Sequence, residues 1–307
     1  MALEDAKGQV DLAFTRSDRR GLAYENAFGG ATSFLRRTYT KDLTGVDLVV
    51  TGVPFDQAVT HRPGCRFGPR AIREASCLQP YDPPYGWDGF DPLSEFSIVD
   101  HGDMPFDYAN VAGVPALVEA HIARIIAAGP GTVTLGGDHF ITLPILRAYA
   151  AKYGTMSVIQ FDAHSDLWAD DDMDRIDHGT FVYKAIKTGI IDPATSVQVG
   201  IRTTNPDPLG VTTIPAREVH EQGAAATVAR IREVLGDRPV YLTFDGNQRI
   251  EASVADARLL ISDLCTYLEE YLTLDQVREV YRAYLFSAEA HEGQQRKSGE
   301  PYIFHPL

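Results

Sequence analysis

From residue 47 to residue 245, short apolar runs alternate with segments of helical periodicity. Such alternation predicts an α/β fold, in which helices cover a parallel sheet. Strands are expected at Asp47–Val53, Glu95–Asp100, Thr132–Leu135, Met156–Gln160, Ser196–Ile201 and Val240–Asp245. Helices are expected from about Ala71, over Ala112–Ala128 and Leu143–Tyr153, up to about Lys187, and over Ala224–Leu235. Residues 1–45 lack such runs and are predicted to form a terminal arm.

Side chains of the metal-ligand type follow three of these strands. Asp162, His164 and Asp166 come directly after one strand, His139 follows another, and Asp245 ends the last. Parallel strands bring their carboxyl ends to one edge of the sheet, so these side chains are expected to converge. Carboxylates with imidazoles favour Mn, Fe or Zn over Mg or Ca. The ligand number suits two ions that hold a bridging hydroxide, which would carry out hydrolysis.

Each of these residues also has a simpler interpretation. A single histidine after a strand is commonly a hydrogen-bonded structural residue. An aspartate in that position commonly caps a helix, which is one interpretation of Asp138. His178, in an Asp-His-Gly-Thr turn, is a candidate general acid or proton shuttle, and a surface histidine in an acidic loop fits the same spacing. Convergence of several strand ends favours the metal site.

The net charge of −14 over 307 residues argues against nucleic acid or an anionic membrane as a partner and suits a cationic substrate. The three cysteines have no C-x-x-C spacing, so neither a zinc knuckle nor a disulfide framework is predicted. The first residues lack the basic and apolar regions of a signal peptide, and no apolar run is long enough to span a bilayer. A cytoplasmic location is therefore expected.

Successive motifs resemble the signature motifs of the ureohydrolases, the family of agmatinase and arginase. These motifs are Gly136-Gly137-Asp138-His139, Asp162-Ala163-His164-Ser165-Asp166, Asp177-His178-Gly179-Thr180 and Thr243-Phe244-Asp245. The loop that holds Arg62-Pro63-Gly64 and Phe67-Gly68-Pro69 resembles the agmatinase branch, and the similarity runs from about residue 20 to Asp245. The resemblance implies an arginase-like three-layer αβα fold with a mostly parallel sheet, a binuclear manganese centre and a homo-oligomer. It also implies hydrolysis of a guanidino compound, foremost agmatine, to urea and an amine, putrescine.

The resemblance assigns roles to individual residues. One manganese ion would be bound by His139, Asp162, Asp166 and Asp245. The other would be bound by Asp162, His164 and Asp245, so that Asp162 and Asp245 bridge the two ions. His178 matches the family's histidine near the substrate, with a proton-transfer role, and is the predicted catalytic and substrate-binding residue.

The chain departs from the family pattern at the last metal motif. The family has Asp-x-Asp, whereas this chain reads Asp245-Gly246-Asn247. A neutral amide binds a divalent ion more weakly than a carboxylate, so the second manganese site is expected to be weakened. A downstream interior strand of the family also has no counterpart here. Residues 1–246 are therefore predicted to form a ureohydrolase-like domain that is incomplete at its carboxyl end, with neighbouring strands left unpaired.

Residues 247–307 are predicted to form a helical tail of different origin. Glu251–Tyr271 and Leu274–His291 have the periodicity of two amphipathic helices. From about residue 250 the sequence resembles the N-terminal start of stringent-response (p)ppGpp synthetase/hydrolases, in which His305 would match a metal ligand. The histidine-aspartate pair that such a site also needs has no counterpart, so alarmone hydrolysis is not expected, and a generic helical hairpin is the alternative. If the metal site is inactive, the chain would be a non-catalytic chimera or a pseudoenzyme whose tail binds a partner.

Overall fold

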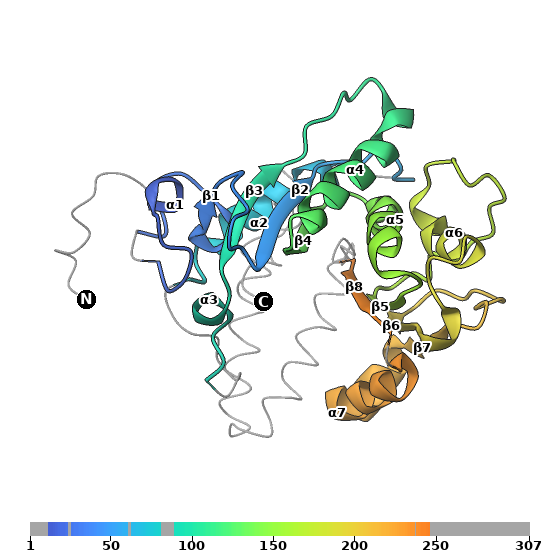
Figure 1. Cartoon of the computed structure of the whole chain (residues 1–307). Coiled ribbons are helices and arrows are strands. Elements are labelled where there is room, and N and C mark those ends of the chain that lie inside the picture. Colours follow the sequence, from blue (N-terminus) through green and yellow to red (C-terminus); the bar gives the residue numbers. More distant parts are fainter. Residues whose placement is uncertain (1–11, 24–25, 61–62, 81–88, 237, 246–307) are drawn as a thin grey trace, which may run out of the picture. The chain divides into compact units, whose positions relative to one another are not determined.

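The computed structural model describes residues 12–23, 26–60, 63–80, 89–236 and 238–245 (Figure 1). The chain divides into two compact units, Met1–Asp245 and Gly246–Leu307. The predicted helical hairpin, Asn247 and His305 lie outside the described residues, so these predictions stay untested.

Eight strands form two four-stranded sheets, ordered β1-β3-β2-β4 and β7-β6-β5-β8. Each of the pairings between these strands is parallel, as the alternating sequence pattern predicts. The strands are β1 (Thr38–Tyr39), β2 (Leu48–Val53), β3 (Ile98–Asp103), β4 (Gly131–Gly136), β5 (Ser157–Phe161), β6 (Val197–Ile201), β7 (Thr212–Pro215) and β8 (Val240–Phe244).

Helices connect the strands and cover the sheets (Figure 1). The α-helices are α1 (Leu12–Thr15), α2 (Gly68–Ser76), α3 (Pro92–Glu95), α4 (Val114–Ala127), α5 (Thr142–Tyr153), α6 (Phe181–Lys187) and α7 (Ala216–Leu235). Short 3-10 turns are η2 (Phe34–Arg36), η3 (Cys65–Phe67), η4 (Val111–Gly113), η5 (His139–Ile141), η6 (His178–Thr180) and η7 (Pro193–Thr195). Within the described part of the chain, no helix is both long and apolar enough to cross a membrane.

Two elements begin at residues other than those predicted from the sequence, and one strand was not predicted. β3 begins at Ile98 instead of Glu95, because Asp91 accepts a hydrogen bond from the Leu93 amide at 3.0 Å and starts the short helix α3. β7 was not predicted, since this four-residue edge strand lacks an apolar run. α7 starts at residue 216 instead of 224, with a break at Gly223, where φ is 77°.

The prediction of a terminal arm is wrong for residues 33–39. β1 pairs with β3, with Thr38 opposite Val99. Ser33 and Arg37 are fully buried. This segment adds an edge strand to the first sheet, which its polar sequence did not indicate.

A buried ion pair holds α2 against the first sheet. The Arg73 guanidinium donates to both carboxylate oxygens of Asp100 on β3, at 2.7 and 3.0 Å. It also donates to Asp103, at 2.5 Å. Two parallel hydrogen bonds between a guanidinium and a carboxylate fix the relative orientation of the two groups in addition to the attraction between their charges. This pair therefore sets the position of α2 on β3.

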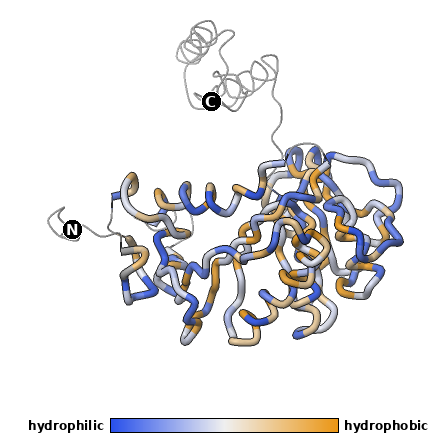
Figure 2. The backbone as a smooth tube through the Cα atoms, turned by 90° about the horizontal axis from the view of Figure 1, so that it is seen from above, coloured by the Kyte–Doolittle hydropathy of each residue, from blue (hydrophilic) through white to orange (hydrophobic). Residues whose placement is uncertain are grey.

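One hydrophobic core joins the two sheets. It contains Val53 at the end of β2, Phe55 just beyond it, Leu146 on α5 and Val158 on β5, all almost fully buried. Hydrophobic and hydrophilic stretches alternate along the described chain (Figure 2). The helices α4, α5 and α6 contribute apolar side chains to this core. Each large apolar side chain buried in this way contributes about 1.5–3 kcal/mol. The packing of α4 against α5, and not strand pairing, therefore connects the sheets.

β4 and β8 each end a sheet, and among the described strands neither outer edge has a partner. Val133 on β4 is 39% exposed, while Leu242 and Phe244 on β8 are 61% and 73% exposed. Parallel sheets are normally covered on both faces, so this exposure is unusual. The prediction that strands next to the missing one stay unpaired remains a prediction, because residues 246–307 lie outside the described part of the chain.

We expect acid to destabilise the protein through His121 on α4. Its Nε2 lies 2.9 Å from the Thr51 hydroxyl, which itself donates to the Gly102 carbonyl, so Nε2–H is the donor. Burial lowers the pKa of His121 to about 4. In the unfolded state His121 has a pKa of about 6.5. Its contribution to the free energy of unfolding is therefore complete above that pH. Up to about 3 kcal/mol should be lost as the pH falls from 6.5 to 4.

Urea unfolding midpoints between pH 4 and pH 8 would measure this loss. His121→Gln keeps a hydrogen-bond donor toward Thr51 but does not titrate, and should flatten this part of the profile. An unchanged slope in the variant would contradict the assignment to His121.

Candidate metal centre

The candidate ligands lie where three parallel strands end. His139 begins η5 directly beyond β4, whereas Asp162 and Asp245 follow β5 and β8. The Asp162 amide donates to the Val199 carbonyl at 3.0 Å, and the Asp245 amide donates to the Phe161 carbonyl at 2.9 Å. These bonds continue the strand ladders by one residue, so the sheet itself positions both carboxylates.

His139 lies among three carboxylates. Its Nδ1 is 3.0 Å from Oδ2 of Asp162, 3.0 Å from Oδ2 of Asp166 and 4.0 Å from Oδ2 of Asp245. One ligand atom each of His139, Asp162 and Asp245 falls within 4.8 Å of the others. The predicted convergence of these four residues at one sheet edge is therefore observed.

The imidazole of His139 is oriented by β8. Its Nε2 lies 2.8 Å from the Thr243 hydroxyl. The buried Nδ1 makes no hydrogen bond of acceptable geometry to a described residue, although two carboxylates are close. With a metal ion bound and Nε2–H donating to Thr243, Nδ1 would present its lone pair to the same point as the carboxylate oxygens. This arrangement fits a metal cation, because a histidine ligand commonly donates its second nitrogen to a fixed acceptor.

The electrostatics of the cluster also favour a cation. Burial raises the pKa of Asp166 above its usual value. Burial opposes the charged forms of His139 and Asp162, but their mutual interaction outweighs it. The pKa of His139 rises to about 10, with Asp166 contributing, and that of Asp162 falls. Three carboxylates around one imidazole leave excess negative charge in a buried place, which a divalent ion would neutralise.

Glutamines inside the buried strands support Asp162. Gln160 Nε2 donates to Asp162 Oδ2 at 2.7 Å, and Gln198 Nε2 donates to Gln160 Oε1 at 2.7 Å. Gln160, Gln198 and Thr243 were not among the predicted site residues. A polar side chain within an otherwise apolar strand is the signal that could have identified them, because a buried polar group needs a partner.

Asp138 beside His139 is a helix cap, as its simpler interpretation predicted. Its carboxylate accepts hydrogen bonds from the Phe140 amide at 3.0 Å and the Ala58 amide at 3.1 Å. Burial raises its pKa to about 7. The neighbouring Gly137 has no room for a side chain, since a Cβ there would collide with the Phe55 carbonyl. Close backbone packing therefore fixes the turn that presents His139.

His164 and His178 lie outside the group formed by His139, Asp162 and Asp245. The exposed His164 ring has Nδ1 3.9 Å from Asp162 Oδ1, and its amide donates to the same oxygen at 2.9 Å. His178 is half-buried at the start of η6, which packs against η5. Asp177 accepts from the Gly179 amide at 2.8 Å and caps that turn. The predicted roles of these two histidines remain predictions.

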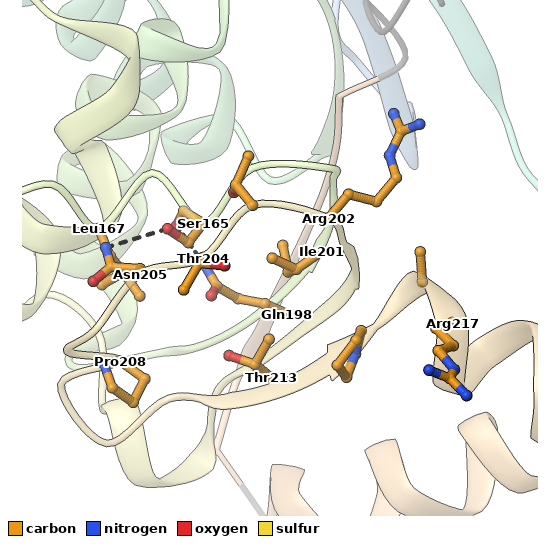
Figure 3. A pocket seen from close by; sticks show the side chains of 13 residues that line it. Ser165, Leu167, Gln198, Ile201, Arg202, Thr204, Asn205, Pro208, Thr213 and Arg217 are labelled. Carbon is orange, nitrogen blue, oxygen red and sulfur yellow. Dashed lines mark hydrogen bonds between the residues drawn. The ribbon is translucent and has the colours of Figure 1, made fainter.

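A second feature near this cluster is a cavity of about 610 Å³, which borders the Asp162–Asp166 loop at Ser165 (Figure 3). Ser165 and Gln198 line it, and Asn205 Nδ2 lies 3.4 Å from the Ser165 hydroxyl. The guanidinium groups of Arg202 and Arg217 point away from Gln198 (Figure 3). The cavity thus borders the loop that carries Asp162 and Asp166 without offering these cations to its centre.

Residues 46–248 match the Arginase family. The chain belongs to this family. An agmatinase of Chromobacterium violaceum is 47% identical over 236 residues, which cover 76% of this chain and 73% of that protein. An agmatinase of Neisseria meningitidis is 44% identical over 200 residues, which cover 65% of this chain and 64% of that protein.

A crystal structure of a hypothetical agmatinase from Burkholderia thailandensis superposes with a TM-score of 0.75 at 49% identity. The matched region covers 77% of this chain and 75% of that one. This arginase-family chain thus spans about two thirds to three quarters of the length of these relatives. The predicted α/β arginase-like fold and the ureohydrolase resemblance are confirmed for this region.

Replacing Thr243 with valine should weaken metal binding. The substitution keeps the side-chain shape but removes the acceptor that orients His139, and such losses reduce metal affinity by about 10- to 100-fold. Manganese titration calorimetry of the metal-free protein would measure the change.

Thr227→Val on α7 is a matched control. Thr227 is equally buried, and its hydroxyl donates to the Gly223 carbonyl at 3.0 Å. Equal manganese affinities of the two variants would show that Thr243 does not orient a ligand.

Proposed function

We propose that this arginase-family chain hydrolyses agmatine to urea and putrescine. The proposal depends on the convergence of His139 with Asp162, Asp166 and Asp245 at the edge of the sheet. Its support from other proteins is the 44–47% identity to proteins named agmatinase, together with the family match over residues 46–248, which includes these four residues. Water would add to the guanidinium carbon, and the bond from that carbon to the alkyl nitrogen would break.

The proposed cofactor is manganese, as two ions. His139, Asp162, Asp166 and Asp245 would hold one ion, and Asp162, His164 and Asp245 the other. Metal ions bound there would polarise the guanidino group and activate water at neutral pH. The donor set of imidazole and carboxylates fits such ions. The second ion is expected to bind with lower affinity, because Asn247 supplies a neutral amide where the family has a carboxylate.

The chain's own residues would bind and orient the substrate. The carboxylates and the overall charge of −14 attract a cationic guanidinium, which raises the rate of encounter. His178 would move the proton that the leaving amine needs, as a general acid. A cytoplasmic location and a homo-oligomer are proposed on the same resemblance.

A non-catalytic role is the second candidate. The open edges of β4 and β8 border the metal centre, and the last metal motif is altered at Asn247. A chimera or pseudoenzyme of this kind would bind a cation without turning over a substrate, and its predicted helical tail would bind a partner.

Incubation of the purified full chain with agmatine and excess Mn²⁺ should release urea and putrescine, and a chelator should abolish the release. Urea would be measured by a colorimetric assay and putrescine by chromatography. No turnover at saturating manganese would reject the catalytic proposal and favour the non-catalytic candidate. His178→Asn should retain manganese and lose about 10²–10⁴-fold in kcat, as expected for a general acid.

Asn247→Asp should increase the number of bound manganese ions from about one to two, because a carboxylate restores charge to the second site. Elemental analysis after dialysis would count the ions per chain. Asn205→Asp provides the same change of charge on a loop of the cavity in Figure 3 and should leave the count unchanged. A count that stays the same in Asn247→Asp would mean that the altered motif does not limit metal binding.

A further inference from the structure

A groove of about 460 Å³ separates the two sheets, and β4 and β8 form its two walls. Residues of α5 form its floor, with Thr142, Ile145 and Tyr149 in contact with it. At one end the groove reaches His139 and Asp245. We call this cavity the strand groove. It is distinct from the cavity of Figure 3, which lies at β6 and β7.

The β4 wall presents backbone groups to the strand groove. The Gly131 amide donates to the Asp47 carbonyl at 3.0 Å, on the β2 side of the strand. Backbone groups alternate sides along a strand, so those of Thr132 and Thr134 face the groove. The Thr132 amide confirms this direction, since it donates to the Tyr149 hydroxyl on the floor at 3.1 Å. The Thr134 hydroxyl is buried and has no hydrogen-bond partner among the described residues.

The β8 wall does the same from the other side. The Asp245 amide donates to the Phe161 carbonyl on β5. By the same alternation, the backbone groups of Leu242 and Phe244 face the strand groove. Both walls run in the same direction, because β4 and β8 belong to parallel sheets with their carboxyl ends at the metal centre.

The side chains at the walls are apolar and exposed. Leu242 and Phe244 project from one face of β8, and Val133 projects from β4. On the opposite face, Tyr241 packs against Tyr149, with ring centroids 5.7 Å apart. The groove thus has a packed floor, two open strand edges and an uncovered apolar face.

We propose that the strand groove binds an extended, mainly apolar segment of a separate polypeptide as a parallel strand between β4 and β8. An extended backbone can bond to two facing strand edges at once, whereas a helix satisfies its own backbone and would leave both edges unpaired. Alternate side chains of the bound segment would contact Tyr149 on the floor and Leu242 on the open face.

The chain's relatives contain sequence that this chain does not match. This chain spans 73% of the Chromobacterium violaceum agmatinase and 75% of the Burkholderia thailandensis chain, so each relative contains a part that has no counterpart here. The family match ends at residue 248, four residues beyond the end of β8 at Phe244. A segment with the chemistry of that unmatched part, supplied by another polypeptide, is the occupant we infer.

Overlapping 15-residue peptides that cover the Chromobacterium violaceum agmatinase sequence provide the probe. Fluorescence anisotropy with the full-length chain would measure binding of each labelled peptide. We expect saturable binding by a peptide from the unmatched part of that sequence and none by peptides from the matched part. Absence of binding by any peptide overturns the proposal.

Variants of the walls test the place of binding. Leu242→Lys should weaken the affinity for the peptide by at least about tenfold, because it places a charge where the leucine is expected to make an apolar contact with the peptide. Leu117→Lys, on an exposed position of α4, is the matched control and should bind as the unmodified chain does. Circular dichroism would check that both variants are folded. Equal binding by both variants would place the peptide elsewhere and overturn the proposal.

N-methylation tests whether the peptide binds as a strand. Methyl groups on alternate backbone nitrogens of the binding peptide remove donors and should abolish binding. Retained binding would indicate apolar contact without strand pairing and would overturn the proposal. Sedimentation of the chain alone would detect a dimer. A dimer that Leu242→Lys dissociates and that excludes the peptide would make a second copy the occupant, which also overturns it.

Discussion

The candidate metal centre depends on the hydrogen bond between His139 and Thr243. This bond in turn depends on how the two sheets pack together. His139 follows a strand of the first sheet, and Thr243 lies on a strand of the second. The bond therefore forms only when helix packing brings the two sheets to the correct separation. It fixes the ring so that Nδ1 meets Asp162 and Asp166, and a ligand held in this way loses little entropy on metal binding.

The two strands that approach the metal centre, β4 and β8, are also those that have no outer partner among the described strands. In an ordinary parallel sheet, each interior backbone amide and carbonyl is paired, and an unpaired buried group costs about 1–3 kcal/mol. Here the core around Leu146 and Val158 holds the sheets together in place of strand pairing. The metal-ligand cluster therefore lies at the end of the groove between β4 and β8, next to the strand edges that have no partner among the described strands.

Much of the fold and of the candidate site could be predicted from local sequence. Most strands and helices follow the periodicity of apolar residues, and the capping role of Asp138 follows from its position after a strand. β1 and β7 could not be predicted this way, because two- and four-residue edge strands are stabilised by their neighbours and not by their own composition. The partner of Gln198 could not be predicted in this way either, because its side chain donates to Gln160 on a neighbouring strand, 38 residues earlier in the sequence.

The sequence by itself determined the kinds of ligand and their order, the parallel arrangement of the strands and the altered residue Asn247. These are properties of residue type and spacing, which are local. Only the tertiary structure decided that β8 lies at an open edge, that Thr243 orients His139, and that Asp166 approaches that ring more closely than Asp245 does. Such features depend on distances between segments up to about a hundred residues apart, which are set by packing and not by local pattern.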